Sequence, residues 1–376
     1  MKIGLVCPYN MFRGGGVQEY VLALRNGFVE RGHKAYVITP QPRSYKGPKV
    51  PGIIMVGGAA PFRAQRTMTD LSVSVDVDSL EEVLKEQNFD ILHFHEPWVP
   101  ILSRQILTRS NAIHFGTFHA AMSERRTQRT IERVITPYTK PLLGYLDVLT
   151  AVSPTATNYV RTLTNRNIII IPNGIEIEKF RRKTPDDRPK DIKTILYIGR
   201  LEKRKAVKQL IEAFGLLHSV HKNYKLVIAG DGPDREKLED LVKEQKIGNV
   251  TFLGFVSDEK KKKLLQESEV MCSPAMYGES FGIVLIEAMA AGCVAIAGNN
   301  SGYESVMTGS GQISIVNPKD TKEFARRLIL MASDEGLRRH WLNWAENEIK
   351  KYDYLNIVDQ YLKLYQTAYD KRHNQE

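Results

Sequence analysis

The sequence predicts an α/β protein with two domains, each built on a parallel β-sheet. At 376 residues, the chain is longer than one hydrophobic core usually supports. Short apolar runs alternate with helix-spaced apolar residues throughout, which is typical of repeated βαβ units. A turn at Pro172-Asn173-Gly174 precedes the charged stretch Lys179–Lys193. We therefore expect domains over residues 1–172 and 173–354.

Each short apolar run is expected to form a buried strand. In the first half, the expected strands are Ile3–Cys7, Ala35–Thr39, Ile53–Val56, Asp90–His95, Ala112–Phe118, Val148–Val152 and Ile168–Ile171. In the second half, they are Thr194–Ile198, Lys225–Ala229, Val250–Leu253, Val270–Ser273, Val294–Ala297 and Ile313–Val316. Two Rossmann-like domains facing each other across a cleft would result.

The spacing of apolar residues also predicts the helices between these strands. Val17, Val21, Leu24 and Phe28 share one face of a helix that ends near Gly32. No strand follows the last expected helix, about residues 355–376. We therefore expect this helix to pack back on the first domain.

Composition limits the classes of function. Hydrophobic residues make up 42% and charged residues 26%, which is ordinary for a soluble globular protein, and no apolar run is long enough to cross a bilayer. A net charge of +10 favours anionic partners. The sequence contains no nucleic-acid-binding module, and the run Lys260–Lys263 reads as the solvated face of a helix.

The N-terminus and the cysteines indicate a cytoplasmic protein. Met1–Pro8 is too short for a signal peptide and is followed at once by sequence typical of a folded domain. Cys7, Cys272 and Cys293 lie in apolar segments without the spacing of a disulfide or metal site. We expect a reducing compartment.

The stretch Tyr277–Gly292 carries the strongest functional signal. Ser280 is placed to cap an apolar helix, Gly282 leaves its first turn open, and Gly292 suits a left-handed stop. Glu279 would precede this helix and Glu287 would lie about two turns inside it. The helix N–H groups could then receive a diphosphate, while the carboxylates bind hexose and ribose hydroxyls. The alternative is a pair of ordinary solvated charges.

Two further segments are phosphate-site candidates. Gly14-Gly15-Gly16-Val17 follows the first strand, where backbone N–H groups could approach a phosphate. It matches neither the dinucleotide nor the Walker fingerprint, which counts against a dehydrogenase or a P-loop protein. The alternative is a tight turn. Gly199–Lys205 follows the expected strand Thr194–Ile198. Its Arg200 and Lys205 could neutralise a leaving diphosphate, a role otherwise given to a divalent metal. The alternative is a basic loop on a basic protein.

Histidines mark the ends of two expected strands. His119 closes the strand Ala112–Phe118, where its ring could contact a hexose or be an ordinary strand-end residue. His93 and His95 share one side of another strand and Glu96 follows them. Because no further ligand is suitably spaced, we expect no metal site.

The order and spacing of these segments are similar to those of a known enzyme family. The sequence resembles the retaining glycosyltransferases of family 4, which have the two-domain GT-B fold, and within them the phosphatidylinositol mannosyltransferases. The resemblance rests on Val6-Cys7-Pro8-Tyr9, Gly-Gly-Val-Gln at 15–18, His95-Glu96-Pro97, Thr117-Phe118-His119, Ile171–Gly174, Gly199-Arg200, Gly278–Leu285 and Tyr352-Asp353.

The resemblance implies roles for individual residues. Gly16 would donate its N–H to the diphosphate that Arg200 and Lys205 neutralise, and His119 would lie beside the reacting sugar. The implied catalytic set is His119, Glu279, Arg200 and Lys205, whereas Gly16 only binds the donor. Donor contacts would come from Val256 at the base, Glu279 at the hexose, Glu287 at the ribose, and the loop residues Ser280, Phe281, Gly282 and Ile283. The acceptor pocket would be bordered by Tyr9 and Gln18.

The family reaction retains anomeric configuration, and the leaving phosphate itself takes the acceptor proton. The resemblance thus implies a donor such as GDP-mannose, no metal and no other cofactor. It also implies an anionic lipid acceptor such as phosphatidyl-myo-inositol and peripheral attachment to the inner face of the cell membrane. Separately, we expect a monomer.

One segment departs from the pattern. Family members that act on phosphatidylinositol carry a basic amphipathic helix before the strand equivalent to Asp90–His95. Here the acidic residues of that segment outnumber its single lysine, Lys85: they are Asp76, Asp78, Glu81, Glu82 and Glu86. A basic stripe of Arg125, Arg129 and Arg133, next to Arg126, could replace that surface.

Three rival functions stay open. The nearest is a UDP-hexose-dependent transferase acting on diacylglycerol or a soluble glycan, which donor preference would distinguish. A sugar-nucleotide 2-epimerase would alter the donor without any acceptor. A non-catalytic basic binding protein would consume no donor.

Overall fold

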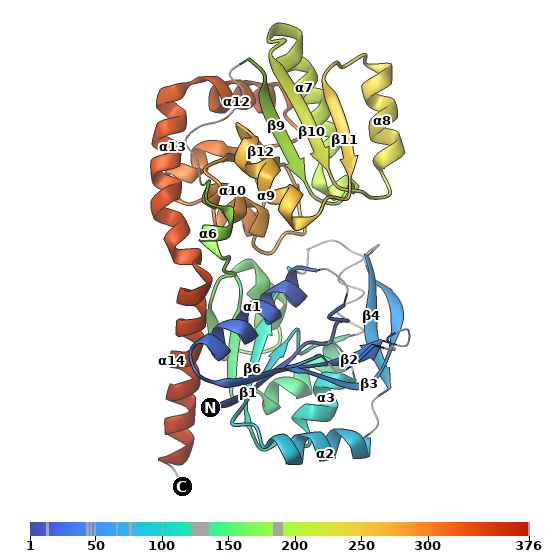
Figure 1. The fold of residues 1–376 in the computed structure, drawn as a ribbon, viewed down its shortest axis with the longest axis vertical. Helices are drawn as coiled ribbons and strands as arrows, with labels where there is room; N and C mark the ends of the chain where they lie inside the picture. Colours follow the sequence, from blue (N-terminus) through green and yellow to red (C-terminus); the bar gives the residue numbers. More distant parts are fainter. Residues whose placement is uncertain are drawn as a thin grey trace. The chain divides into compact units, whose positions relative to one another are not determined.

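The computed structural model divides the chain into two compact units (Figure 1). One unit comprises Met1–Gly174 and Tyr354–Glu376, and the other comprises Ile175–Asp353. Sequence reasoning put the division between residues 172 and 173. The structure describes residues 1–12, 15–42, 45, 47–48, 50–64, 67–74, 77–99, 101–121, 135–182 and 191–374.

Across these residues, the first unit contains an eight-stranded sheet in the order β4-β3-β2-β1-β5-β6-β7-β8. Its strands are β1 (Lys2–Val6), β2 (Lys34–Pro42), β3 (Ile53–Ala64), β4 (Thr67–Ser74), β5 (Ile91–His95), β6 (Ile113–Phe118), β7 (Val148–Ala151) and β8 (Ile168–Ile170). The neighbours from β3 to β8 pair in parallel. Seven of these strands correspond to expected apolar runs.

The strand β4 was missed, and β3 is longer than the expected Ile53–Val56. The two strands pair antiparallel, with Gly58 opposite Ser74 and Ala64 opposite Thr67. Residues 57–74 contain glycine, proline, threonine and serine rather than an apolar run. An edge hairpin does not need the continuous apolar sequence of a buried parallel strand, so the apolar-run criterion did not detect it.

The helices of the first unit include two that pack together although they lie at opposite ends of the chain. The helices include α1 (Gly16–Glu30), α2 (Val77–Gln87), α3 (Leu102–Leu107), α5 (Asn158–Arg161) and α14 (Tyr354–His373), and residues 135–142 are also helical. In α1, the expected residues Val21, Leu24 and Phe28 are buried, and Gly32 follows the helix with φ 82°.

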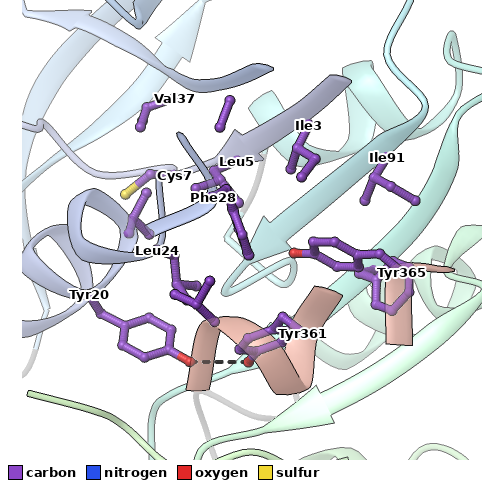
Figure 2. Packing of buried hydrophobic residues seen from close by; sticks show 14 of the residues in the cluster. Ile3, Leu5, Cys7, Tyr20, Leu24, Phe28, Val37, Ile91, Tyr361 and Tyr365 are labelled. Carbon is purple, nitrogen blue, oxygen red and sulfur yellow. Dashed lines mark hydrogen bonds between the residues drawn. The ribbon is translucent and has the colours of Figure 1, made fainter. Parts of the chain in front are cut away.

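The C-terminal helix α14 completes the core of the first unit (Figure 2). Tyr361 and Tyr365 pack among residues of α1 and β1, and the hydroxyl of Tyr20 donates to that of Tyr361 at 3.2 Å. The Arg31 guanidinium binds the Asp359 carboxylate through two hydrogen bonds of 2.8 and 2.9 Å. The chain thus closes its first unit only with its last helix.

Within its described part, the second unit contains a six-stranded sheet in the order β11-β10-β9-β12-β13-β14, with every neighbouring pair parallel. Its strands are β9 (Lys193–Ile198), β10 (Tyr224–Ala229), β11 (Val250–Gly254), β12 (Val270–Ser273), β13 (Val294–Gly298) and β14 (Ile315–Val316). The last strand is shorter than the expected Ile313–Val316, because residues Gly309–Ser314 form 3₁₀ turns.

The helices of the second unit flank this sheet (Figure 1). They are α6 (Ile177–Phe180), α7 (Val207–Val220), α8 (Arg235–Glu244), α9 (Asp258–Glu267), α10 (Ile283–Ala290), α11 (Ser301–Glu304), α12 (Thr321–Ser333) and α13 (Glu335–Glu348). The short 3₁₀ turn η3 (Lys203–Lys205) joins β9 to α7.

In both sheets, the direction in which successive strands are added reverses at one strand. Such a reversal is where open α/β sheets bind ligands. In the first sheet, the chain builds outward from β1 to β3 and later places β5 on the other side of β1. In the second sheet, it builds from β9 to β11 and then places β12 on the other side of β9. Ligands of open α/β sheets bind outside the carboxyl ends of strands at such a reversal. We therefore expect ligand contacts from the loops after β1, β5, β9 and β12.

Candidate functional site

In the second unit, the strand reversal brings together three residues singled out in the sequence. Arg200 and Lys205 lie in the segment after β9, and Glu279 lies in the loop after β12. The buried phenol of Tyr197, on β9, donates a hydrogen bond of 2.8 Å to the carbonyl of Arg200. This bond helps fix the start of the basic segment beside the Glu279 loop.

Glu279 is the centre of this cluster. Its Oε1 atom lies 2.8 Å from Lys205 Nζ and also accepts a close contact from the Arg204 guanidinium. Burial raises the pKa of this carboxyl, but the charges and hydrogen bonds of Lys205 and Arg204 outweigh burial, so its pKa lies below the ordinary value. Glu279 is therefore an anion at neutral pH, positioned by two cations.

Glu202 extends the cluster into a chain of alternating charges. This buried carboxylate lies 2.9 Å from Arg200 Nε and 3.0 Å from Arg204 Nε. Arg204 in turn contacts Glu279 and donates to the Gly278 carbonyl at 3.2 Å. Sequence reasoning missed Glu202 and Arg204, although the alternation of charge at 200, 202 and 204 was visible.

The helix α10 begins differently from the expectation. Its first residue is Ile283 and its N-cap is Gly282, with φ 102° and no side-chain capping bond. The N-cap is therefore Gly282 and not Ser280, so that prediction was wrong. The expected stop is confirmed: Gly292 has φ 65°, and its N–H donates to the Met289 carbonyl at 3.0 Å.

The second carboxylate, Glu287, lies just over one turn inside α10 rather than two, because the helix begins at Ile283. Its side chain is buried, and Oε1 lies 2.7 Å from Lys261 Nζ. The prediction that the Lys260–Lys263 run forms only a solvated face was wrong at Lys261, whose side chain is 18% exposed. Lys261 also lies over the Phe180 ring, with its Nζ 5.8 Å from the ring centre.

The remaining residues predicted to contact the donor differ in how accessible their side chains are. Val256 is half-buried in the turn between β11 and α9, beside Phe255, which is 88% exposed. The Phe281 side chain is buried and packs edge-on against the Tyr352 ring. Only the backbone of Phe281 is therefore suited to ligand contact, while Ile283 provides the first N–H of α10.

In the first unit, the predicted acceptor residues lie around the end of β1. Tyr9 follows β1, and its carbonyl accepts a 2.9 Å bond from the Thr39 hydroxyl. Gln18 lies in the first turn of α1 and donates a weak 3.4 Å bond to the Asn10 carbonyl. Gly16 is the exposed first residue of α1. Gly14, also in the predicted phosphate loop, lies outside the described residues.

His119 lies directly after β6, as expected, and is buried. Its Nε2 atom is 3.0 Å from His95 Nδ1, and burial lowers the pKa of His119 to about 3. The backbone N–H groups of His119 and Ala120 donate to Glu96 Oε1 at 2.8 and 2.6 Å. His119 is thus a neutral imidazole held by two residues of the neighbouring strand end.

His93 and His95 lie on the same side of β5, as predicted, with ring centres 4.3 Å apart. The ring nitrogens of His93 bond to Tyr365 and Thr117, each at 2.5 Å, within the core of the unit. Among the described residues, no three histidine, cysteine or acidic side chains are arranged to hold a metal.

The surface of α2 is acidic, as its sequence indicated. Its exposed side chains include Asp78, Glu81, Glu82 and Glu86 against Lys85. Asp76 and the basic stripe Arg125, Arg126, Arg129 and Arg133 lie outside the described residues. No helix in the described ranges is long and apolar enough to span a bilayer.

Both units match families of known proteins. Residues 14–179 match the family described as Glycosyltransferase Family 4, and residues 177–348 match Glycosyl transferases group 1. The chain is 30% identical over 375 residues to a phosphatidyl-myo-inositol mannosyltransferase of Mycolicibacterium smegmatis, covering 98% of this chain and 94% of that protein. It is 23% identical to an alpha-monoglucosyldiacylglycerol synthase of Acholeplasma laidlawii, covering 77% and 78% respectively.

Solved structures support the fold. The sucrose-phosphate synthase of Thermosynechococcus elongatus matches with a TM-score of 0.79 and 19% identity, over 98% of this chain and 99% of that one. Anabaena HepE in complex with UDP-glucose matches with a TM-score of 0.77 and 16% identity, over 98% and 100%. Both neighbours have the GT-B fold. With matches along nearly its whole length, this chain belongs to glycosyltransferase family 4.

Proposed function

We propose that this glycosyltransferase moves a mannosyl residue from GDP-mannose to phosphatidyl-myo-inositol, with retention of anomeric configuration. The observation that carries the proposal is the similarity to phosphatidyl-myo-inositol mannosyltransferases over nearly the whole chain, at 30% identity in Mycolicibacterium smegmatis and 29% in Mycobacterium leprae. Similarity along the whole chain includes both the expected donor unit and the expected acceptor unit.

The donor diphosphate is assigned to the basic segment after β9 and the start of α10. Arg200 and Lys205 would neutralise it, and the N–H of Ile283 would add a hydrogen bond at the positive end of the helix dipole. The proposal is supported by the contact between Lys205 and Glu279, because it keeps a cation beside the carboxylate assigned to the hexose.

The rest of the donor is assigned to residues on either side of that segment. Glu279 would accept hydrogen bonds from hexose hydroxyls, and its low pKa keeps it ionised for this role. Glu287 would accept from the ribose, and the backbone around Val256 would contact the base. The Ser280–Gly282 backbone would line the hexose side of the loop.

The proposed reaction needs no enzyme nucleophile. The bond between the anomeric carbon and the diphosphate oxygen breaks, and the acceptor hydroxyl attacks from the same face while its proton passes to the leaving phosphate. Charge builds on the diphosphate during this step, so Arg200 and Lys205 would stabilise the transition state more than the ground state. These cations could replace a divalent metal.

The acceptor is assigned to the first unit. Tyr9 and Gln18 follow β1 at the strand reversal, and His119 follows β6. The net charge of +10 supports an acceptor in an anionic membrane surface, to which a monomeric enzyme would attach from the cytoplasmic side.

A second candidate is a UDP-glucose-dependent transfer to a diacylglycerol lipid. It is favoured by the similarity to the monoglucosyldiacylglycerol synthase, which covers 77% of this chain. The two candidates differ in both the nucleotide and the acceptor headgroup.

The test pairs each donor with each lipid. Purified protein is incubated with GDP-mannose or UDP-glucose and with liposomes containing phosphatidylinositol or diacylglycerol, with and without EDTA. Mass spectrometry identifies the glycolipid, and the anomeric proton coupling gives the linkage. We expect an α-linked mannosyl phosphatidylinositol, formed in EDTA and lost in Glu279→Gln. Product only from UDP-glucose and diacylglycerol would replace the proposal by the second candidate. A β-linked product would overturn retention.

A further inference from the structure

The segment His95-Glu96 carries polar contacts that the proposed function does not yet use. His95 ends β5, and Glu96 follows it with φ 53°, a backbone conformation uncommon for a residue other than glycine. β5 pairs in parallel with β6, with His95 opposite Thr117, so the ends of both strands meet at the same edge of the sheet. His119 lies at that edge.

Glu96 holds the backbone that carries His119. The residue is 1% exposed, and its Oε1 atom accepts the N–H groups of both His119 and Ala120. The other oxygen accepts the indole N–H of Trp98. Because the two oxygens of this buried carboxylate accept hydrogen bonds from three N–H groups, they fix the position of each donor.

His95 contacts the ring of the same histidine. Its Nδ1 atom lies 3.0 Å from His119 Nε2, and both side chains are buried. The Tyr20 ring packs edge-on against both imidazoles, with ring centres 5.9 and 5.2 Å away. The two rings are therefore confined as well as bonded.

The second nitrogen of His95 decides which ring donates. His95 Nε2 is buried and has no hydrogen-bond partner among the described residues. A buried N–H without an acceptor costs more than a buried lone pair without a donor. The proton of neutral His95 therefore belongs on Nδ1, which donates to His119 Nε2. Neutral His119 must then carry its own proton on Nδ1.

We propose that His95 and Glu96 are the positioning residues of His119, Glu96 by holding its backbone and His95 by fixing its ring as the Nδ1–H tautomer. His119 then offers the reacting sugar a hydrogen-bond donor at Nδ1 and cannot accept a proton there. The proposal rests on the proposed role of His119 beside the sugar. Burial, which lowers the pKa of both histidines, keeps the pair neutral.

The tautomer can be measured without donor or acceptor. The full chain is labelled with ¹⁵N-histidine, and two-bond ¹H–¹⁵N correlation spectra distinguish protonated from unprotonated ring nitrogens. His119→Gln assigns the signals. We expect neutral His119 with its proton on Nδ1 from pH 6 to 8, in the wild type and in His95→Asn, whose amide N–H replaces Nδ1. A wild-type His119 with its proton on Nε2 would overturn the ring assignment.

Amide hydrogen exchange tests whether Glu96 holds the backbone at His119 and Ala120. We expect the amide protons of His119 and Ala120 to exchange at least about tenfold faster in Glu96→Ala than in the wild type, because their acceptor is gone. Glu96→Gln keeps Oε1 and should keep the protection. Unchanged exchange in Glu96→Ala would show that the carboxylate does not hold this backbone.

Kinetics then test the consequence for the reaction. His95→Phe should lower kcat by about tenfold or more while leaving the donor KM within about twofold, and His95→Asn should restore most of kcat. His114→Asn is the matched control, because His114 is a buried histidine on β6 that bonds to the Tyr145 carbonyl instead. Equal kcat in His95→Phe and the wild type would contradict the positioning role. The spectra and exchange rates decide the contacts even if the inositol-lipid activity is absent.

Discussion

Lys205 Nζ lies 2.8 Å from Glu279 Oε1, which joins the segment after β9 to the loop after β12. The same oxygen contacts Arg204, so one carboxylate balances two cations in a cluster whose side chains are 13% to 29% exposed. A change to one of these charges alters the environment of the other two. Variants of the cluster should therefore differ in which step they affect.

Glu279→Gln should reduce turnover far more than nucleotide binding. The amide keeps the size of the side chain but loses the charge that accepts hexose hydroxyls. We expect kcat to fall about 100-fold while the Kd for the nucleoside diphosphate changes less than about threefold. Steady-state kinetics and calorimetry give the two quantities. Glu323→Gln is the control, since Glu323 pairs with Arg326 and Arg327 on α12. Equal losses in kcat and affinity would refute the assignment of Glu279 to the transferred sugar.

Lys205→Ala should weaken binding of the donor diphosphate. Loss of a charge-assisted contact costs about 1.5–3 kcal/mol, or about 10- to 150-fold in Kd. The control is Lys208→Ala, because Lys208 is 60% exposed and lies 3.7 Å from Glu212 within α7. Calorimetric titration with the nucleoside diphosphate measures both. If the two variants bind equally well, Lys205 is not part of the diphosphate site.

Glu96 should make the first unit less stable as pH rises. Burial raises the pKa of this carboxyl from 4.5 to about 7. Between these values the folded state holds a proton that the unfolded state has released, so stability falls with increasing pH. The full loss is about 3 kcal/mol, reached above pH 7. Glu96→Gln cannot titrate and should not show this fall.

The measurement needs a probe in the first unit alone. Trp98 belongs to that unit, whereas Trp341 and Trp344 belong to the other. Urea unfolding followed by the ¹⁹F signal of fluorotryptophan at position 98 therefore reports the relevant stability. We expect the difference between Glu96→Gln and the wild type to grow from pH 4.5 to 7. A difference that is constant over this range would contradict the raised pKa.

Gly282→Ala should destabilise the protein more than Gly292→Ala. Both glycines have positive φ, 102° and 65°, at the two ends of α10. A Cβ at 282 would lie 2.7 Å from two ring carbons of Tyr303, whereas a Cβ at 292 meets nothing within 4 Å. We expect about 1–2 kcal/mol for Gly292→Ala from backbone strain alone, and about 1–3 kcal/mol more for Gly282→Ala.

Urea midpoints compare these two variants, and donor titration adds a second readout. Tyr303 bonds to Ser273 at 2.6 Å, and its pKa is raised by burial and by the nearby Glu279. A displaced Tyr303 ring should therefore disturb Glu279 and weaken donor binding in Gly282→Ala only. Equal effects of the two substitutions would show that the loop adapts to a Cβ at 282.

Strands buried in the parallel sheets were predictable because they are continuous apolar runs between turn signals. The hairpin of β3 and β4 was not, because an edge strand can be polar and its pairing depends on the preceding parallel strand. Gly292 was predictable as a helix stop, since left-handed backbone favours glycine. Ser280 was assigned wrongly because residue type suggested a cap, while the backbone at Gly282 decided where the helix begins.

The candidate site also contains features that the sequence predicted and features that it could not predict. Residue type and position after a strand were enough to select Glu279, Arg200, Lys205 and His119, because parallel strands align their carboxyl ends. Local sequence could not show that Arg204 and Lys205 share one carboxylate oxygen, or that Lys261 reaches Glu287. Those contacts depend on how far each loop folds over its sheet, which side-chain packing determines. The alternation of apolar runs and turns thus determined the parallel strands of the two sheets and the types of residue that follow them. Tertiary structure alone decided the partners of each charge and the enclosure of His119, since these arise between segments far apart in the chain.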